Sequence, residues 1–177
     1  MKLVPLVLAV VVALTAVAPA VSAQETKAIN LALFDPVQIF SRDYAIEGFR
    51  FNLIYGNNAG VTGLDIGLAN WSTGDVVGVE WGLINMTKGN FTGWQSAPVQ
   101  KVDGFMKGIQ TSMILSMSGS GKGLQWAGIT ISDDFTGVQL GIVNYAVQFH
   151  GIQLGLLNII KEGGMLPFFP IFNFSFD

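Results

Sequence analysis

Glycine recurs along this chain at a nearly constant interval. The steps are 15 residues five times and then 14 residues twice. The glycines are Gly48, Gly63, Gly78, Gly93, Gly108, Gly123, Gly137 and Gly151. A fixed short period is the signature of a repeat fold, in which each unit packs mainly against its neighbours. The period therefore constrains the fold more than any single motif does.

The residues that follow each glycine keep their type from unit to unit. The first position is apolar, the second polar, the third mostly apolar, the fourth small and the sixth apolar. The second position holds Arg50, Asp65, Glu80, Gln95, Gln110, Gln125, Gln139 and Gln153. In four units the seventh position is Asn, at Asn70, Asn85, Asn144 and Asn158. Alternation with a period of two predicts strands, and the frequent glycine argues against helices.

Two architectures fit this pattern. The first is an all-β solenoid of about eight repeats, with one coil of 14 or 15 residues per unit and three sides of five residues. Apolar positions, the sixth included, would point inward and the polar second position outward. Stacked coils would align Gln110, Gln125, Gln139 and Gln153 in one row, with Asn70 and Asn85, then Asn144 and Asn158, in another.

The second architecture is a small antiparallel outer-membrane β-barrel. Each unit would then be one spanning strand, and the segment from Pro170 to Phe176 alternates aromatic and polar residues as a closing strand would. Barrels usually alternate short and long connections, whereas the unit length here barely changes. The sequence therefore favours the solenoid and leaves the barrel as the alternative.

The first 23 residues predict a secretory signal peptide. Lys2 precedes an uncharged apolar stretch from Leu3 to Ala20, and the small residues Val21-Ser22-Ala23 form a cleavage site. A retained membrane anchor is the alternative, because the stretch approaches spanning length. The expected organisation is a signal peptide (1–23), an N-terminal capping segment (24–47), tandem β repeats (48–162) and a C-terminal closing strand (163–177).

Composition excludes several classes of site. Only 12% of the residues are charged and the net charge is −3, which argues against a nucleic-acid-binding surface. The chain has no Cys and one His, so thiolate metal sites, disulfides and His-based charge relays lack their residues. Asp133-Asp134 is interpreted as a solvated turn rather than a cation site, and His150 as an exposed strand residue. The four tryptophans are expected in the core or at a membrane interface rather than on sugars. No catalytic, metal or cofactor-binding residue, and no cofactor, is predicted.

Two late units are distinctive enough to suggest a family. Residues 138–144 read VQLGIVN and residues 152–158 read IQLGLLN. They resemble the tandem GLQIGLxN units of bacterial surface repeat-containing proteins, and residues 163–170, GGMLPFFP, are also similar. The resemblance covers about residues 36–176. The units of Gly93 and Gly108 depart from it at Ser96, Pro98 and Thr111, where less regular coils are expected.

That family is functionally uncharacterised, so the resemblance implies export and a repeat architecture but no activity. The expected function is that of an exported, non-enzymatic repeat protein, a structural or interaction surface at the bacterial cell envelope. The alternative is an outer-membrane barrel that acts as a pore or an anchor. The expected location is the periplasm, the cell surface or the outer membrane, and the sequence identifies no partner.

Overall fold

The computed structural model describes residues 25–176, so the predicted signal peptide and its cleavage site lie outside the described residues. Residues 25–176 form ten strands. These are β1 (Thr26–Phe34), β2 (Val37–Gln38), β3 (Ala45–Asn58), β4 (Gly60–Ser72), β5 (Val76–Trp81), β6 (Ile84–Thr87), β7 (Phe91–Ser96), β8 (Val99–Thr111), β9 (Leu115–Glu162) and β10 (Phe168–Ser175). Within residues 25–176, no helix is long and apolar enough to cross a membrane.

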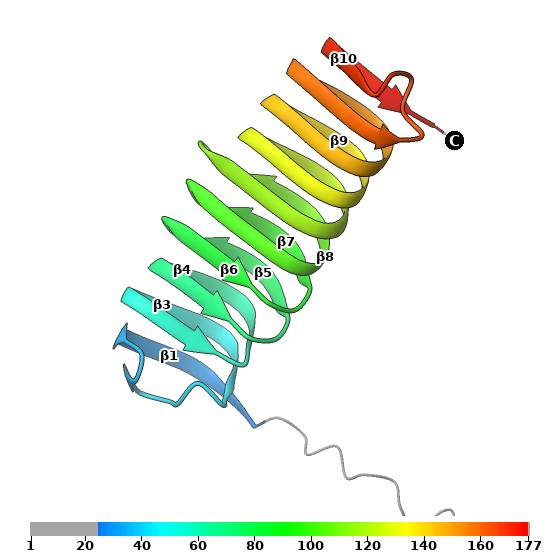
Figure 1. Ribbon diagram of the computed structural model, residues 1–177. Coiled ribbons are helices and arrows are strands. Elements are labelled where there is room, and N and C mark those ends of the chain that lie inside the picture. Colours follow the sequence, from blue (N-terminus) through cyan, green and yellow to red (C-terminus); the bar gives the residue numbers. More distant parts are fainter. Residues whose placement is uncertain (1–24, 177) are drawn as a thin grey trace, which may run out of the picture.

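The repeats stack as parallel coils in the register that the glycines predict. Gly48 pairs with Gly63, Gly63 with Gly78, and the pairing continues through Gly93 and Gly108 to Gly123. Figure 1 shows the coils following one another along a single axis, and together they make a β-solenoid of about seven turns. The solenoid prediction is confirmed. The antiparallel barrel is wrong, because successive units run in the same direction.

The eight repeat glycines share one backbone conformation. Their φ angles lie between 127° and 145°, a region that residues with a Cβ rarely adopt. A Cβ built on Gly93 would also collide with the carbonyl oxygen of Gly78 in the preceding coil. Both the conformation and the space therefore require glycine once per coil, which explains the period.

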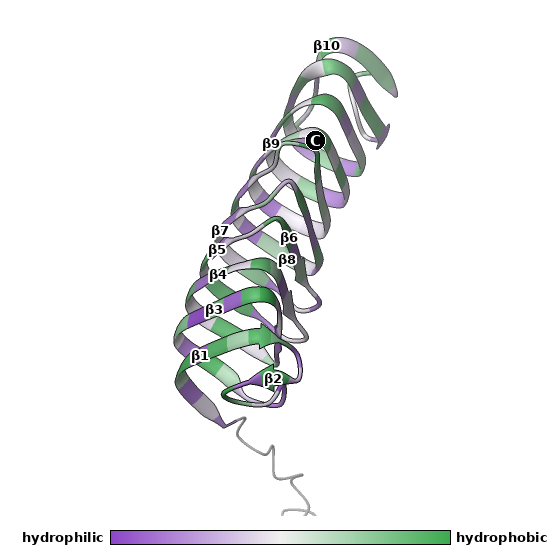
Figure 2. Ribbon diagram, turned by 90° about the vertical axis from the view of Figure 1, so that its left-hand side faces the viewer, coloured by the Kyte–Doolittle hydropathy of each residue, from purple (hydrophilic) through white to green (hydrophobic). Residues whose placement is uncertain are grey.

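Each coil has two strand-forming sides, not the three sides of five residues expected from the sequence. On the first side, Val61 to Ile66 of β4 pairs with Val76 to Trp81 of β5. On the second side, Ala69 to Ser72 of β4 pairs with β6. A tight corner joins the two sides. A short loop leads from β4 to β5 in the next coil, whereas β9 continues from coil to coil without a break. In Figure 2, hydrophilic and hydrophobic residues alternate along each coil and recur at the same places from coil to coil.

The middle coils are interrupted but keep their register. Ala97 and Pro98 separate β7 from β8, and residues 112–114 separate β8 from β9. Gly93 nevertheless pairs with Gly108, and Thr111 with Trp126. The expected irregularity is therefore confined to the corner, while the strand sides stay in phase.

Antiparallel strands close both ends. β1 pairs in parallel with β3, so the first coil begins inside the segment 24–47, and β2 then folds back against β1. At the other end β10 pairs antiparallel with the last coil of β9. These reversals end the parallel stacking, as expected for terminal capping elements of a repeat array.

Candidate binding surface

The orientation of the side chains is the reverse of the expected one on the first side of each coil. All eight residues at the second position after the glycine have no exposed surface, although the sequence analysis placed them outside. The apolar residues at the sixth position were expected inside, yet Ile54, Ile84 and Ile114 are about half exposed. Most of the apolar interior comes instead from the position two residues before the repeat glycines, with Ile46, Val61, Val76, Phe91, Met106, Phe135 and Phe149. The second side of the coils adds Val102, Ala146 and Ile160.

The buried glutamines form a ladder along the axis. Gln110 Nε2 donates to Gln95 Oε1 at 2.8 Å, and the same bond joins Gln125 to Gln110 at 2.8 Å. The ladder continues from Gln139 and Gln153, each at 2.7 Å from the preceding glutamine. Parallel coils lie about 4.8 Å apart, a spacing at which each amide reaches the next one. Within the ladder each glutamine is therefore bonded to its neighbours, which offsets the usual cost of burial, and only Oε1 of Gln153 at its end has no partner.

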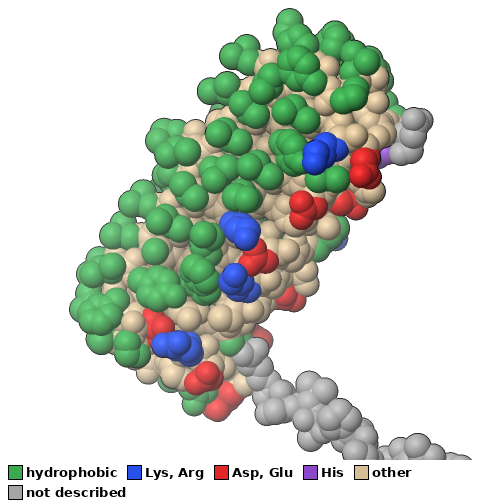
Figure 3. All heavy atoms as spheres, in the orientation of Figure 1, with side chains coloured by type: hydrophobic (Ala, Val, Ile, Leu, Met, Phe, Trp, Pro, Cys, Tyr) green, Lys and Arg blue, Asp and Glu red, His purple; other side chains and the backbone are tan. Residues whose placement is uncertain are grey.

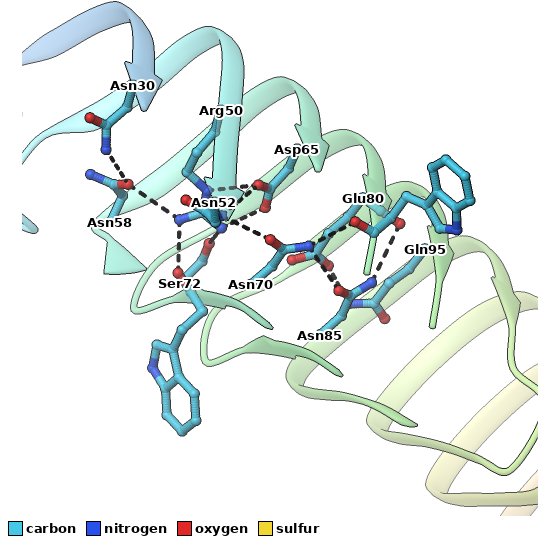
Figure 4. A network of polar contacts seen from close by, with 12 residues as sticks. Asn30, Arg50, Asn52, Asn58, Asp65, Asn70, Ser72, Glu80, Asn85 and Gln95 are labelled. Atoms are coloured by element: carbon cyan, nitrogen blue, oxygen red, sulfur yellow. Dashed lines mark hydrogen bonds and ion pairs between the residues drawn. The ribbon is translucent and has the colours of Figure 1, made fainter. Parts of the chain in front are cut away.

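The row ends in ionisable residues toward the N-terminal end. Arg50 forms a paired contact with Asp65, Nε to Oδ1 at 2.8 Å and Nη2 to Oδ2 at 2.5 Å. Glu80 follows, and Gln95 Nε2 donates to its Oε2 at 2.5 Å. Burial, together with the negative charge of Asp65, raises the pKa of Glu80 to about 8. Figure 4 shows these side chains in one connected line inside the coils.

The asparagine rows lie on the second side, as expected. Asn70 Nδ2 donates to Asn85 Oδ1 at 3.0 Å, and Asn144 Nδ2 donates to Asn158 Oδ1 at 2.8 Å. All four side chains are buried. The alignment of both the Gln and Asn rows is confirmed, and only the outward direction of the Gln row is wrong.

With the polar residues inside, apolar residues cover the corner of the solenoid. We call this surface the apolar edge, defined as the first, third, fifth and sixth positions after each glycine. None of these positions in the eight coils holds a charged residue, and only Ser96 and Thr111 are polar. Trp81 and Trp126 are each 61% exposed and Leu156 is 72% exposed. A contiguous apolar surface of this extent marks a site of interaction with a protein or a membrane.

A groove runs along the apolar edge. Its floor is the small fourth position, including Gly67, Gly82, Ala127 and Gly141, and its walls are the third and fifth positions. Three contiguous stretches of the groove have volumes of about 330, 380 and 650 Å³. The first two meet at Trp81 and Gly82, and the last two at Met113 and Trp126. From Gly48 to Gly151 the coils rise roughly 34 Å, at about 4.8 Å per step.

Exposed charges lie away from the apolar edge. We call the side where one coil passes to the next the loop edge, which carries Asp75, Lys88, Asp103, Asp133, Asp134, Lys161 and Glu162. The remaining exposed charges of residues 48–162 are Lys101, Lys107 and Lys122, which lie on the two strand sides. Figure 3 shows hydrophobic side chains over much of one face, with charged side chains gathered along its border.

The candidate residues from the sequence analysis lie outside the groove. Asp133 and Asp134 are exposed as expected, but they lie within strand β9 and not in a turn, so that part of the prediction is wrong. The ring of His150 meets the ring of Phe176 edge-on with centroids 6.1 Å apart. Within residues 25–176, no three His, Cys, Asp or Glu residues come together as metal ligands. Trp81, Trp94 and Trp126 are exposed on the apolar edge, so the expectation of a core position is wrong for these three.

No protein-family model, curated protein or solved structure matches the chain significantly. The surface is therefore interpreted from its own chemistry. One signal in the sequence could have revealed its orientation: Gln occupies the second position in five successive units. A buried ladder needs the same amide side chain in each successive coil, whereas a position exposed to solvent tolerates many different polar residues.

Proposed function

We propose that the protein is an exported, non-enzymatic scaffold that attaches to the bacterial cell envelope through its apolar edge. The observation that carries the proposal is the charge-free edge with its continuous groove along all the coils. A monomer that stays in solution rarely exposes so long an apolar surface. The signal peptide predicted at residues 1–23 supports export, and the resemblance to surface repeat proteins supports the envelope.

The construction of the interior supports a scaffold rather than an enzyme. The carboxylates Asp65 and Glu80 are enclosed by the ladder and have no exposed surface, so a substrate does not reach them. The groove itself is lined by carbon atoms apart from a few hydroxyl and amide groups. Such a lining provides area for binding and no acid, base or nucleophile of ordinary catalytic strength.

Cell fractionation with matched variants tests this function. In an expressing bacterium, the protein should sediment with the envelope and remain there after a high-salt wash. Trp81→Glu combined with Trp126→Glu should move it to the soluble fraction, because both substitutions place charge on the apolar edge. Phe105→Glu is the control: Phe105 is 45% exposed but lies at the loop edge. A wild-type protein found only in the soluble fraction contradicts the proposal.

A further inference from the structure

We propose that the partner of the apolar edge is a lipid bilayer with anionic headgroups, on which the solenoid lies with its axis in the membrane plane. This inference rests on the proposed function, since it names the partner of the same surface. Three observations carry it: the hydrogen-bonding state of the groove, the distribution of lysines and aspartates, and the aromatic residues beside the lysines.

The groove offers its occupant almost no hydrogen bonds. At the corner the backbone groups are used between coils: Gly82 N–H donates to Ser96 C=O, and Ser112 N–H to Trp126 C=O. Leu83 N–H likewise donates to Leu68 C=O. A peptide laid in the groove would lose water from its own N–H and C=O groups without replacement, which is costly. Hydrocarbon chains have no such groups to satisfy.

The charges are arranged as an anionic surface requires. Lys107 and Lys122 point outward on the first side, immediately before their glycines, and Lys101 points outward on the second side. These positions flank the apolar edge, the first two about four residues or roughly 13 Å along the strand from its third-position row. Glu47 holds the same outward position in the coil of Gly48, and the aspartates lie farther away on the loop edge. With the apolar edge among the acyl chains, the lysines reach the headgroups and the aspartates face water.

Asp103 neutralises only part of the positive charge of the neighbouring lysines. It pairs with both Lys88 and Lys101, at 2.9 and 2.6 Å, so the three residues together keep one positive charge. The two lysines also hold the pKa of Asp103 below its usual value. The group therefore remains cationic over the physiological pH range.

Aromatic rings of the second side lie beside two lysines of the loop edge. Lys88 Nζ lies 5.6 Å from the ring centroid of Trp71, and Lys161 Nζ lies 6.0 Å from that of Tyr145. Trp71 and Tyr145 occupy the same position in their coils, between the apolar edge and the loop edge. Trp and Tyr beside Lys are the residues that concentrate at the boundary between acyl chains and headgroups.

Vesicle flotation tests the inference. Purified protein is mixed with vesicles of phosphatidylcholine alone or with one quarter phosphatidylglycerol. We expect flotation with the anionic vesicles, a partition coefficient at least tenfold lower for Trp81→Glu with Trp126→Glu, and no change for Phe105→Glu. Lys107→Glu with Lys122→Glu should lower partition into anionic vesicles at least tenfold and leave partition into neutral vesicles unchanged. Circular dichroism confirms that each variant is folded.

A second measurement requires no substitution. Lipids brominated on the acyl chain should quench the fluorescence of the wild-type protein, because Trp81 and Trp126 would lie among the chains. Failure to float with either vesicle, or flotation that is insensitive to the double tryptophan variant, would overturn the inference. The wild-type protein could instead form a dimer without lipid and fail to bind vesicles. If the double tryptophan variant were then monomeric, the apolar edge would be assigned to contact with a second copy of the chain. If the protein associates with the envelope in cells but does not bind purified vesicles, the lipid partner is rejected and the proposed function is retained.

Discussion

Gln95 Nε2 donates a hydrogen bond to Glu80 Oε2 across 2.5 Å inside the solenoid, where neither side chain has exposed surface. This contact joins a ladder of neutral amides to the charged pair of Arg50 and Asp65. Glu80 Oε1 has no hydrogen-bond partner. The stability of the fold should therefore respond to the charge state of this buried carboxyl group.

Stability should fall as the pH rises through the pKa of Glu80. The folded-state pKa is about 8, above the ordinary value of 4.5, so the folded protein binds more protons than the unfolded chain between these values. The contribution of Glu80 is therefore complete below pH 4.5 and is lost as the pH rises through about 8, a change of a few kcal/mol in order of magnitude.

Glu80→Gln isolates this effect, because it keeps an acceptor for Gln95 and removes the titrating group. The variant and the wild type should have similar urea midpoints near pH 4.5, and the variant should be more stable at pH 9. Equal midpoints of the two proteins at pH 9 would show that the fold does not raise the pKa of Glu80.

A buried glutamine should matter more than an exposed isoleucine. Gln139→Ala removes the bonds to Gln125 and Ser132 and takes from Gln153 one of its two acceptors, so we expect a loss of about 2–4 kcal/mol in the free energy of unfolding. Ile142→Ala is the control, since Ile142 is 60% exposed, and should cost less than about 0.5 kcal/mol. Chemical denaturation measures both. The opposite order would place the glutamine row on the surface.

Substitution of a repeat glycine should be severe. Gly93 has a φ of 135°, and a Cβ there would collide with Gly78 of the neighbouring coil. Gly93→Ala should therefore cost at least about 2 kcal/mol. Thr92→Ala, at the adjacent exposed position, should leave the thermal midpoint nearly unchanged. Equal midpoints for the two variants would contradict the close approach of successive coils at this glycine.

Removal of one complete coil should leave a folded protein. Deletion of Gly78 to Thr92 joins Val77 to Gly93 and keeps the phase of the repeat, because Gly78 and Gly93 occupy equivalent positions. Gln95 would then face Asp65. We expect a cooperative thermal transition and a particle about 4.8 Å shorter by small-angle scattering.

Deletion of Gly78 to Asn85 is the control for this experiment, because it removes about half a coil. It joins a residue of the first side to one of the second, so the interior and exterior positions no longer match. This shorter deletion should abolish cooperative unfolding. If both deletion variants were equally unfolded, the phase of the repeat would not govern the folding of the array.

The sequence was sufficient for the period and the strands, and it favoured parallel stacking over the antiparallel barrel. The φ of the eight glycines and the close approach of neighbouring coils require glycine at one position per coil, so this requirement is visible as an interval in the sequence. The rows of Gln110 to Gln153 and of the asparagines followed from the same register. These features repeat, and a feature that repeats in every coil is recorded directly in the linear chain.

The tertiary structure decided which residues face inward. A single strand with polar Gln139 between apolar Val138 and Leu140 favours a polar exterior, because one buried amide without partners is costly. Stacking reverses this preference, since each coil supplies the amide that satisfies the next. These hydrogen bonds form only between coils, so the alternation of residues within one coil does not reveal them. The apolar edge, its groove and the raised pKa of Glu80 all follow from this reversal, and they became apparent only once the coils were stacked.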